Sequence, residues 1–216
     1  GSECKENESK LEVKKKAVIE IAENLFFSQG LATNKKKEIA RCASISRSTL
    51  YRMFDSRETL AFAVADKCLH ELFGPKPMEI YGTDRSGFEI LRSYSSNLIE
   101  TMLQGVRYVN YLSEFDQMFS GDYPDTPEAR KYVQFNRQRL DRQILLYFLR
   151  LGTEDGSIRG DIDANMLELT IGNTLLGVAQ RILPREKNYR QEYGYGREIL
   201  YNVMELMVEG VRNKDA

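Results

Sequence analysis

Two short helical patterns separated by a small-residue turn occupy residues 33–59, and they constrain the fold more than any other stretch. Ile39, Ala40 and Ala43 fall at positions i, i+1 and i+4, which gives one apolar face to a helix of about ten residues. The segment Ala43-Ser44-Ile45 interrupts this pattern, and Ser46 is a good N-cap for a second helix. The stretch is therefore predicted to form a helix, a tight turn and another helix.

The second of these helices separates apolar from polar side chains. Leu50, Met53 and Phe54 share one face at spacing i, i+3 and i+4. The opposite face carries Arg47, Ser48, Tyr51 and Arg52. A short helix that exposes these side chains together can hydrogen-bond both base edges and phosphates. A helix-turn-helix with such a polar outer face is the arrangement that reads the major groove of DNA.

A run of lysines precedes the motif. Lys35, Lys36 and Lys37 fall in the first turn of its first helix, after Thr33 or Asn34 as cap. Cations there oppose the helix dipole, which makes sense if a phosphate docks at that helix N-terminus. Residues 30–54 hold six basic residues and one acidic residue, although the whole chain has a net charge of −1. A basic patch on a mildly acidic body suits a protein that binds a polyanion with one end.

Residues 17–64 also resemble the DNA-binding domain of the TetR family of bacterial one-component regulators. The matching positions are Ala22, Leu25, Phe26, Gly30, Ile39, Ala40, Ala43, Ile45, Ser46, Thr49, Leu50, Tyr51, Phe54, Ser56, Glu58 and Leu60. Three positions depart from the family pattern. The family usually has Gly at the position of Ser44, often Gly at that of Ser48, and commonly a small or apolar residue at that of Lys36.

The helix-turn-helix pattern and the resemblance together assign a set of DNA-binding residues. Arg47 and Ser48 are expected to meet base edges, Tyr51 and Arg52 to hold phosphates, and Thr49 to do either. The full predicted set is Thr33, Lys35, Lys36, Lys37, Ser46, Arg47, Ser48, Thr49, Tyr51, Arg52 and Arg57. The resemblance further implies that the helix after the motif, residues 57–73, carries an allosteric movement to it.

The rest of the chain is predicted to be helical. Apolar residues recur at helical spacing in residues 9–29, 57–73, 86–104, 106–119, 128–151, 164–183 and about 196–212. No segment alternates like a strand, so the class is all-α, with about nine helices. We expect a helix-turn-helix domain over residues 9–56 and a helical effector-binding and dimerisation domain over 57–213. Gly1-Ser2 is interpreted as the remnant of an expression tag, and residues 1–8 as a disordered tail.

The last two predicted helices carry more apolar surface than one side of a helical bundle requires. Gly172, Gly177 and Gly210 would also permit close helix approach. This surplus indicates a homodimer interface made of two helices from each subunit, with one large monomeric core as the alternative. The predicted interface residues are Leu169, Asn173, Leu176, Val203, Met207 and Gly210. A dimer also fits a helix-turn-helix protein, because such proteins usually read palindromes.

Aromatic and methionine side chains are frequent in the middle helices. They are candidates for an apolar pocket with hydroxyl groups, as small-molecule sites tend to have. Residues at this spacing also occur as ordinary core, and that interpretation stays open. The candidate effector-pocket residues are Tyr94, Met102, Tyr108, Tyr111, Phe115, Met118 and Phe119.

These patterns favour a dimeric transcriptional regulator, most simply a repressor released from a palindromic DNA operator by a small apolar or aromatic effector. The alternative is a protein-interaction or architectural factor of the same fold, with the basic helix at 128–151 as its partner surface. An enzyme is not expected, since the sequence has no phosphate-binding loop, metal-ligand cluster or catalytic His pairing. No cofactor and no metal are predicted.

Composition indicates where such a protein would act. No apolar run reaches the roughly 18 residues that a membrane span needs, and no signal peptide is visible. The 3 cysteines are odd in number and lack a CxxC motif. A reduced cytoplasmic compartment is the prediction, with double-stranded DNA, a small-molecule effector and a second copy of the chain as partners.

Overall fold

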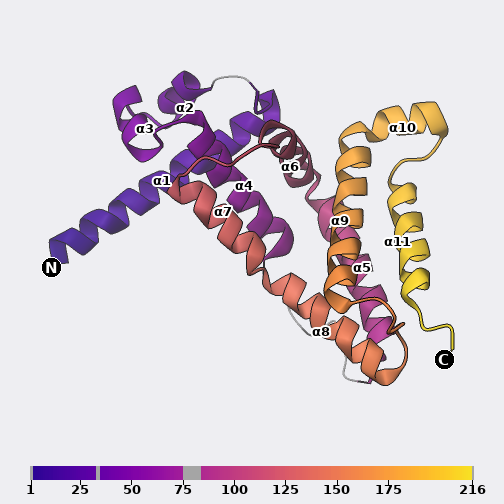
Figure 1. Cartoon of the computed structure of the whole chain (residues 1–216). Helices are drawn as coiled ribbons and strands as arrows, with labels where there is room; N and C mark the ends of the chain where they lie inside the picture. Colours follow the sequence, from indigo (N-terminus) through magenta and orange to yellow (C-terminus); the bar gives the residue numbers. More distant parts are fainter. Residues whose placement is uncertain (1, 33–34, 75–83, 216) are drawn as a thin grey trace. The chain divides into compact units, whose positions relative to one another are not determined.

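Figure 1 shows the computed structural model, which describes residues 2–32, 35–74 and 84–215. Every regular element in these residues is a helix, and their one β-type pairing is an isolated bridge between Ile158 and Arg212. The all-α prediction is confirmed. Within the same residues, no helix has the length and apolar character needed to cross a membrane.

The chain divides into two compact units. Unit 1 comprises Gly1–Cys68 and Tyr111–Asn136, and unit 2 comprises Leu69–Asn110 and Arg137–Ala216. Two helices contribute several residues to each unit, namely α4 (Arg57–Phe73) and α6 (Val106–Met118).

Unit 1 is built around aromatic side chains. Its other helices are α1 (Ser2–Gln29), α2 (Lys36–Cys42), α3 (Arg47–Met53) and α7 (Pro127–Arg137). The fully buried Phe62 of α4 lies with its ring centroid 4.9 Å from that of Phe115 and 5.6 Å from that of Tyr132. The Tyr111 hydroxyl donates to the Ala61 carbonyl of α4 over 2.7 Å. Burial raises the pKa of Tyr111 well above its ordinary value, so this hydroxyl stays a donor.

Unit 2 contains α5 (Gly87–Gln104), α8 (Leu140–Asp155), α9 (Ala164–Ile182), α10 (Glu186–Tyr193) and α11 (Arg197–Val211). A capping box begins α5, in which the Ser86 side chain accepts from the Glu89 backbone and the Glu89 side chain accepts from the Ser86 backbone. A Cβ on Gly87 would lie 2.3 Å from the Gly152 Cα, so α5 and α8 can pack this closely only because residue 87 is glycine. Helices α9 and α11 run side by side (Figure 1).

The structure corrects the N-terminal prediction. Residues 1–8 were expected to form a disordered tail, but α1 begins at Ser2 and extends beyond the rest of unit 1 (Figure 1). No residue of α1 before Val18 is buried. This part of α1 is rich in Glu and Lys, which are good helix formers, and Glu6 pairs with Lys10 over 3.2 Å at spacing i, i+4.

Two further boundaries differ from prediction. The single helix expected at 128–151 is interrupted between α7 and α8, where Arg139 adopts φ −55° and ψ 123°. The Arg139 guanidinium lies 3.8 Å from the Phe73 ring and also pairs with Asp141, and these contacts stabilise the interruption. Residues 184–195, which fall between two predicted helices, include most of a 3-10 turn, Leu183–Arg185, that leads directly into α10.

Candidate DNA-binding interface

The turn between α2 and α3 is held by backbone hydrogen bonds. The Ser44 amide donates to the Arg41 carbonyl over 3.1 Å, and the Ile45 amide donates to the Ala40 carbonyl over 3.0 Å. Ser44 has φ +54° and is the only non-glycine residue with positive φ in the described chain. This left-handed conformation is strained for serine, so the turn is tight at a cost in stability.

Helix α3 begins and packs as its sequence predicts. Ser46 is its N-cap, with φ −71° and ψ 157°, and its hydroxyl accepts from the Thr49 amide over 3.1 Å. The inner residues Leu50, Met53 and Phe54 are buried. The outer side chains that are exposed to solvent are Arg47, Ser48, Tyr51 and Arg52.

Three hydroxyls at the start of α3 form a small network. The Ser46 Oγ lies 3.0 Å from the Ser48 Oγ and 2.8 Å from the Thr49 Oγ1. The Ser46 hydroxyl, which also accepts from the Thr49 amide, uses its full capacity, whereas the Ser48 and Thr49 hydroxyls can still donate or accept. The network therefore orients these side chains before any partner arrives, which reduces the entropy lost on binding.

Helices α2 and α3 meet through a cation–π contact that spacing arguments did not predict. The Lys36 ammonium lies 3.9 Å from the centroid of the Tyr51 ring, and Tyr51 remains 48% exposed. Of the neighbouring lysines, Lys37 is exposed and Lys35 is half-buried. Lys36, at the position where the TetR family commonly has a small or apolar residue, thus brings a positive charge onto the exposed face of α3.

Two members of the predicted DNA-binding set stand apart. Thr33 lies outside the described residues. Arg57 donates to the Ala32 carbonyl over 3.1 Å and lies 3.9 Å from Glu58, so its guanidinium ties the start of α4 to the segment after α1. The same segment receives a contact that sequence reasoning missed, because the Leu31 amide donates to the Glu114 carboxylate of α6.

The residues predicted to line an effector pocket do not gather in one place. Tyr94 lines a pocket of about 200 Å³ in unit 2, together with residues of α4, α5 and α8 that include Phe73, Asn97, Thr101 and Asp141. The Tyr94 hydroxyl donates to the Asp141 carbonyl over 3.2 Å. Tyr111, Phe115, Met118 and Phe119 belong to unit 1, Met102 is fully buried, and Tyr108 contacts Arg107.

The residues predicted at a dimer interface share an uncovered strip on α9 and α11. Leu169 is 43% exposed, and the neighbouring Leu206 of α11 is 68% exposed. A Cβ added to Gly172, Gly177 or Gly210 would meet no atom within 4 Å. Among the other predicted members, Asn173 is exposed, and the half-buried ones are Leu176, Val203 and Met207. We call Met166, Leu169, Leu206 and the residues of this prediction the α9–α11 face.

Known proteins similar to this chain are regulators. The HTH-type transcriptional repressor KstR2 of Rhodococcus jostii is 27% identical over 153 residues, which cover 69% of this chain and 70% of that protein. KstR2 of Mycolicibacterium smegmatis is 26% identical over 161 residues, covering 73% of each. The solved structure of the ketosteroid transcriptional regulator KstR2 of Mycobacterium tuberculosis matches with a TM-score of 0.60 at 19% identity, covering 93% of this chain and 95% of that one.

A second solved structure, a tetR-family regulatory protein from Rhodococcus RHA1, matches with a TM-score of 0.65 at 15% identity and covers 92% of this chain and 96% of that one. The geometry of α2, the turn and α3, with these likenesses, defines a DNA-binding transcriptional regulator of the helix-turn-helix class. Residues 18–64 match the family described as bacterial regulatory proteins, tetR family. Over these residues the chain is therefore similar to the TetR family.

Proposed function

We propose that this regulator is a homodimeric repressor that binds a palindromic operator and is released from it by a small apolar or aromatic effector. The observation that carries the proposal is the exposed face of α3, where Arg47, Tyr51 and Arg52 surround a preformed hydroxyl network. Such a face combines bidentate donors for guanine edges with donors for phosphates.

The proposed DNA contacts are of two kinds, those to base edges and those to phosphates. Arg47 and Ser48, near the N-terminus of α3, are proposed to read bases, because recognition helices contact base edges with their N-terminal residues. Tyr51, Arg52 and the lysines at positions 35–37 are proposed to hold phosphates. The Lys36–Tyr51 contact supports this division, since it places an ammonium over the Tyr51 ring, and both the ammonium and the phenol hydroxyl can donate to phosphate oxygens.

The α9–α11 face supports the dimer. Uncovered leucine and methionine side chains with open glycines between them are suited to close packing against an identical pair of helices. A two-fold axis there would present two copies of α3 to one duplex. Half-sites one helical turn apart, about 34–36 Å, are the spacing that such dimers read.

The pocket in unit 2 supports an effector of modest size. Its volume of about 200 Å³ is below the roughly 300–1,000 Å³ of most ligand sites, so the effector is either small or enlarges the pocket on entry. Tyr94 and Phe73 supply aromatic surface. One of the similar structures is a ketosteroid regulator, and an apolar ring compound of that kind falls in the proposed class. The effector releases DNA only if it binds the two conformations unequally.

The alternative of a protein-interaction factor is less well supported, because three basic side chains of α7 and α8 form ion pairs within the chain. Arg142 makes a two-pronged ion pair with Glu168, at 2.8 and 3.1 Å. Arg130 pairs with Asp125, and Lys131 lies 3.7 Å from Asp66. A regulator of this kind is proposed to act in the cytoplasm, without catalytic activity.

Selection from random duplex pools tests the proposal. The protein is expected to enrich a palindrome, with a salt dependence set by several phosphate contacts, each contributing a slope of about −0.9. Enrichment of no sequence, with only weak binding that is lost at moderate salt, would contradict the repressor. The selected site then serves to screen ring compounds for release of DNA, monitored by fluorescence anisotropy.

A further inference from the structure

The end of α1 is attached to α6 by a hydrogen bond between groups far apart in the chain. Gly30 ends α1 with φ +85°, and the next amide, that of Leu31, donates to the Glu114 Oε2 over 2.8 Å. The Leu31 side chain is fully buried. A carboxylate that accepts from a backbone amide makes a charge-assisted bond, which is stronger than a neutral one.

The next residue along is attached to a different helix. The Ala32 carbonyl accepts from the Arg57 guanidinium at the start of α4 over 3.1 Å. The backbone just after α1 is thus held by two side chains. Glu114 of α6 accepts from the Leu31 amide, and Arg57 of α4 donates to the Ala32 carbonyl. We call residues 31–32 with these two contacts the α1 exit.

Helix α6 makes two long-range contacts within unit 1. It is one continuous helix, Val106–Met118, whose residues up to Asn110 belong to unit 2 and whose residues from Tyr111 belong to unit 1. Tyr111 and Glu114 lie one turn apart on the same side of α6. Tyr111 holds the backbone of α4 at Ala61, and Glu114 holds Leu31.

We propose that Glu114 is a positioning residue for DNA binding, through which α6 holds the α1 exit and thereby the approach to α2 and its lysines. This inference rests on the proposed DNA-binding function. Loss of the Glu114 acceptor removes the bond to Leu31. The α1 exit then becomes free to move, and binding DNA must order it again.

Two substitutions at one position separate the hydrogen bond from the charge. Glu114→Ala and Glu114→Gln both remove one negative charge, which by itself strengthens binding to a polyanion. Only Glu114→Ala also removes the acceptor. We expect Glu114→Ala to weaken binding to the selected duplex by about three- to tenfold, and Glu114→Gln to bind within about twofold of the unchanged protein.

Amide exchange of Leu31 gives a readout that a purely structural role would not single out. It should accelerate about tenfold in Glu114→Ala and little in Glu114→Gln, while amides inside α3 keep their protection. Should Glu114→Ala fail to fold, Glu114→Asp replaces it, because it keeps the charge but withdraws the acceptor by one methylene. Its affinity should fall while that of Glu114→Gln does not.

The role of Glu114 would be overturned if Glu114→Ala and Glu114→Gln bind the duplex with the same affinity, whether that affinity is unchanged or reduced. The proposed function fails differently, since the unchanged protein would then select no duplex at all. A protein that selects a palindrome, with variants that all bind it equally, retains the function and loses this inference.

Discussion

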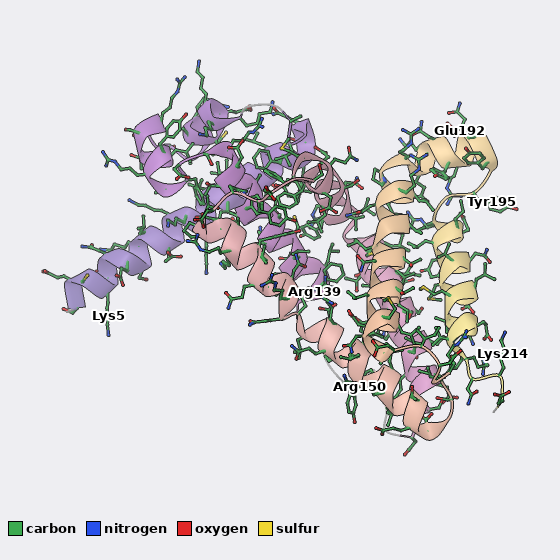
Figure 2. All side chains as sticks on the ribbon, in the orientation of Figure 1. Lys5, Arg139, Arg150, Glu192, Tyr195 and Lys214 are labelled. Carbon is green, nitrogen blue, oxygen red and sulfur yellow. The ribbon has the colours of Figure 1, made fainter. Side chains whose placement is uncertain are left out.

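The exposed face of α3 and the α9–α11 face both present side chains to solvent and differ in chemistry. On α3 the exposed groups are guanidinium, hydroxyl and phenol, and several already contact one another, as in the Lys36–Tyr51 pair. On the α9–α11 face they are leucine and methionine with glycine between them. Figure 2 shows a third exposed region, where Tyr195 points away from the ribbon at the turn between α10 and α11.

Each of the two faces is suited to a different kind of partner. Polar groups that are oriented in advance suit a hydrated, charged partner, because they exchange water for phosphate or base without reordering. Apolar groups without cover gain free energy by leaving water, and an identical surface can provide that cover. Damage to the exposed face of α3 should therefore leave the dimer intact, whereas loss of the dimer should also weaken binding to a palindrome, which takes two copies of α3.

The largest effect is expected from Leu206→Glu on the α9–α11 face. In a two-fold interface this substitution places like charges near each other, so the dimer dissociation constant should rise about a hundredfold or more. Sedimentation at several concentrations measures the change. Tyr147→Glu, on the 61% exposed Tyr147 of α8, is the matched control and should leave the dimer intact. A dimer that survives Leu206→Glu would remove this face as the interface.

Arg47→Ala should have the next largest effect, on DNA alone. Loss of a bidentate base contact costs about 1–3 kcal/mol and relaxes sequence preference at one position of each half-site. Titration of duplexes with single base changes shows this directly, while sedimentation should show an unchanged dimer. A uniform loss across all duplexes would instead assign Arg47 to phosphate binding.

Lys37→Gln should weaken binding evenly across sequences and leave selectivity unchanged. Removing one phosphate contact reduces the steepness of log K against log salt by about 0.9. Lys187→Gln on α10, also an exposed lysine, is the control and should not alter the slope. The same slope in all three proteins would contradict a phosphate contact at Lys37.

Ser44→Gly and Ser48→Gly make the same chemical change with opposite expected signs. Ser44 adopts φ +54°, which glycine accepts without strain, so Ser44→Gly should stabilise the protein by about 0.5–1 kcal/mol. Ser48 lies inside α3, where glycine costs about 0.5–1 kcal/mol. Thermal unfolding should move by about 2–4 °C per kcal/mol in a chain of this size. A stabilising Ser48→Gly would speak against the helical-propensity argument.

The smallest effect concerns stability at low pH near the turn between α10 and α11. A hydrogen bond from Arg197 is the main cause that lowers the pKa of Glu186 from 4.5 to about 2; partial burial opposes it and Arg190 adds to it. Because the folded pKa is depressed, this contribution to stability is present above about pH 4.5 and is lost as pH falls toward 2. The Arg197 amide donates to the Glu186 carboxylate over 3.4 Å, so its protection factor should fall over that range, but not in Glu186→Ala, where it is low throughout.

Several elements were predictable from local sequence. The inner face of α3, its Ser46 cap, the end of α1 at Gly30 and the start of α5 at Ser86 all depend on residues within one or two turns. The interruption at Arg139 was not predictable, because no glycine or proline marks it. It depends on Phe73, which lies on another helix.

The candidate pocket shows the same limit. Composition and spacing made Tyr94 and Tyr111 equally good candidates for the effector pocket. In the structure, Tyr94 lines a pocket in unit 2, whereas Tyr111 is buried in the ring cluster of unit 1. Periodicity states which residues share a helix face, and it carries no information on what that face meets.

The all-α class, the position of the helix-turn-helix and the polar face of α3 were all predictable from the amino-acid sequence, because capping, turn geometry and helical spacing act over a few residues. Three contacts required the folded chain: Lys36 rests on Tyr51, Arg57 holds Ala32, and Glu114 of α6 holds the end of α1. They join groups from different helices, and they form only when the helices have packed.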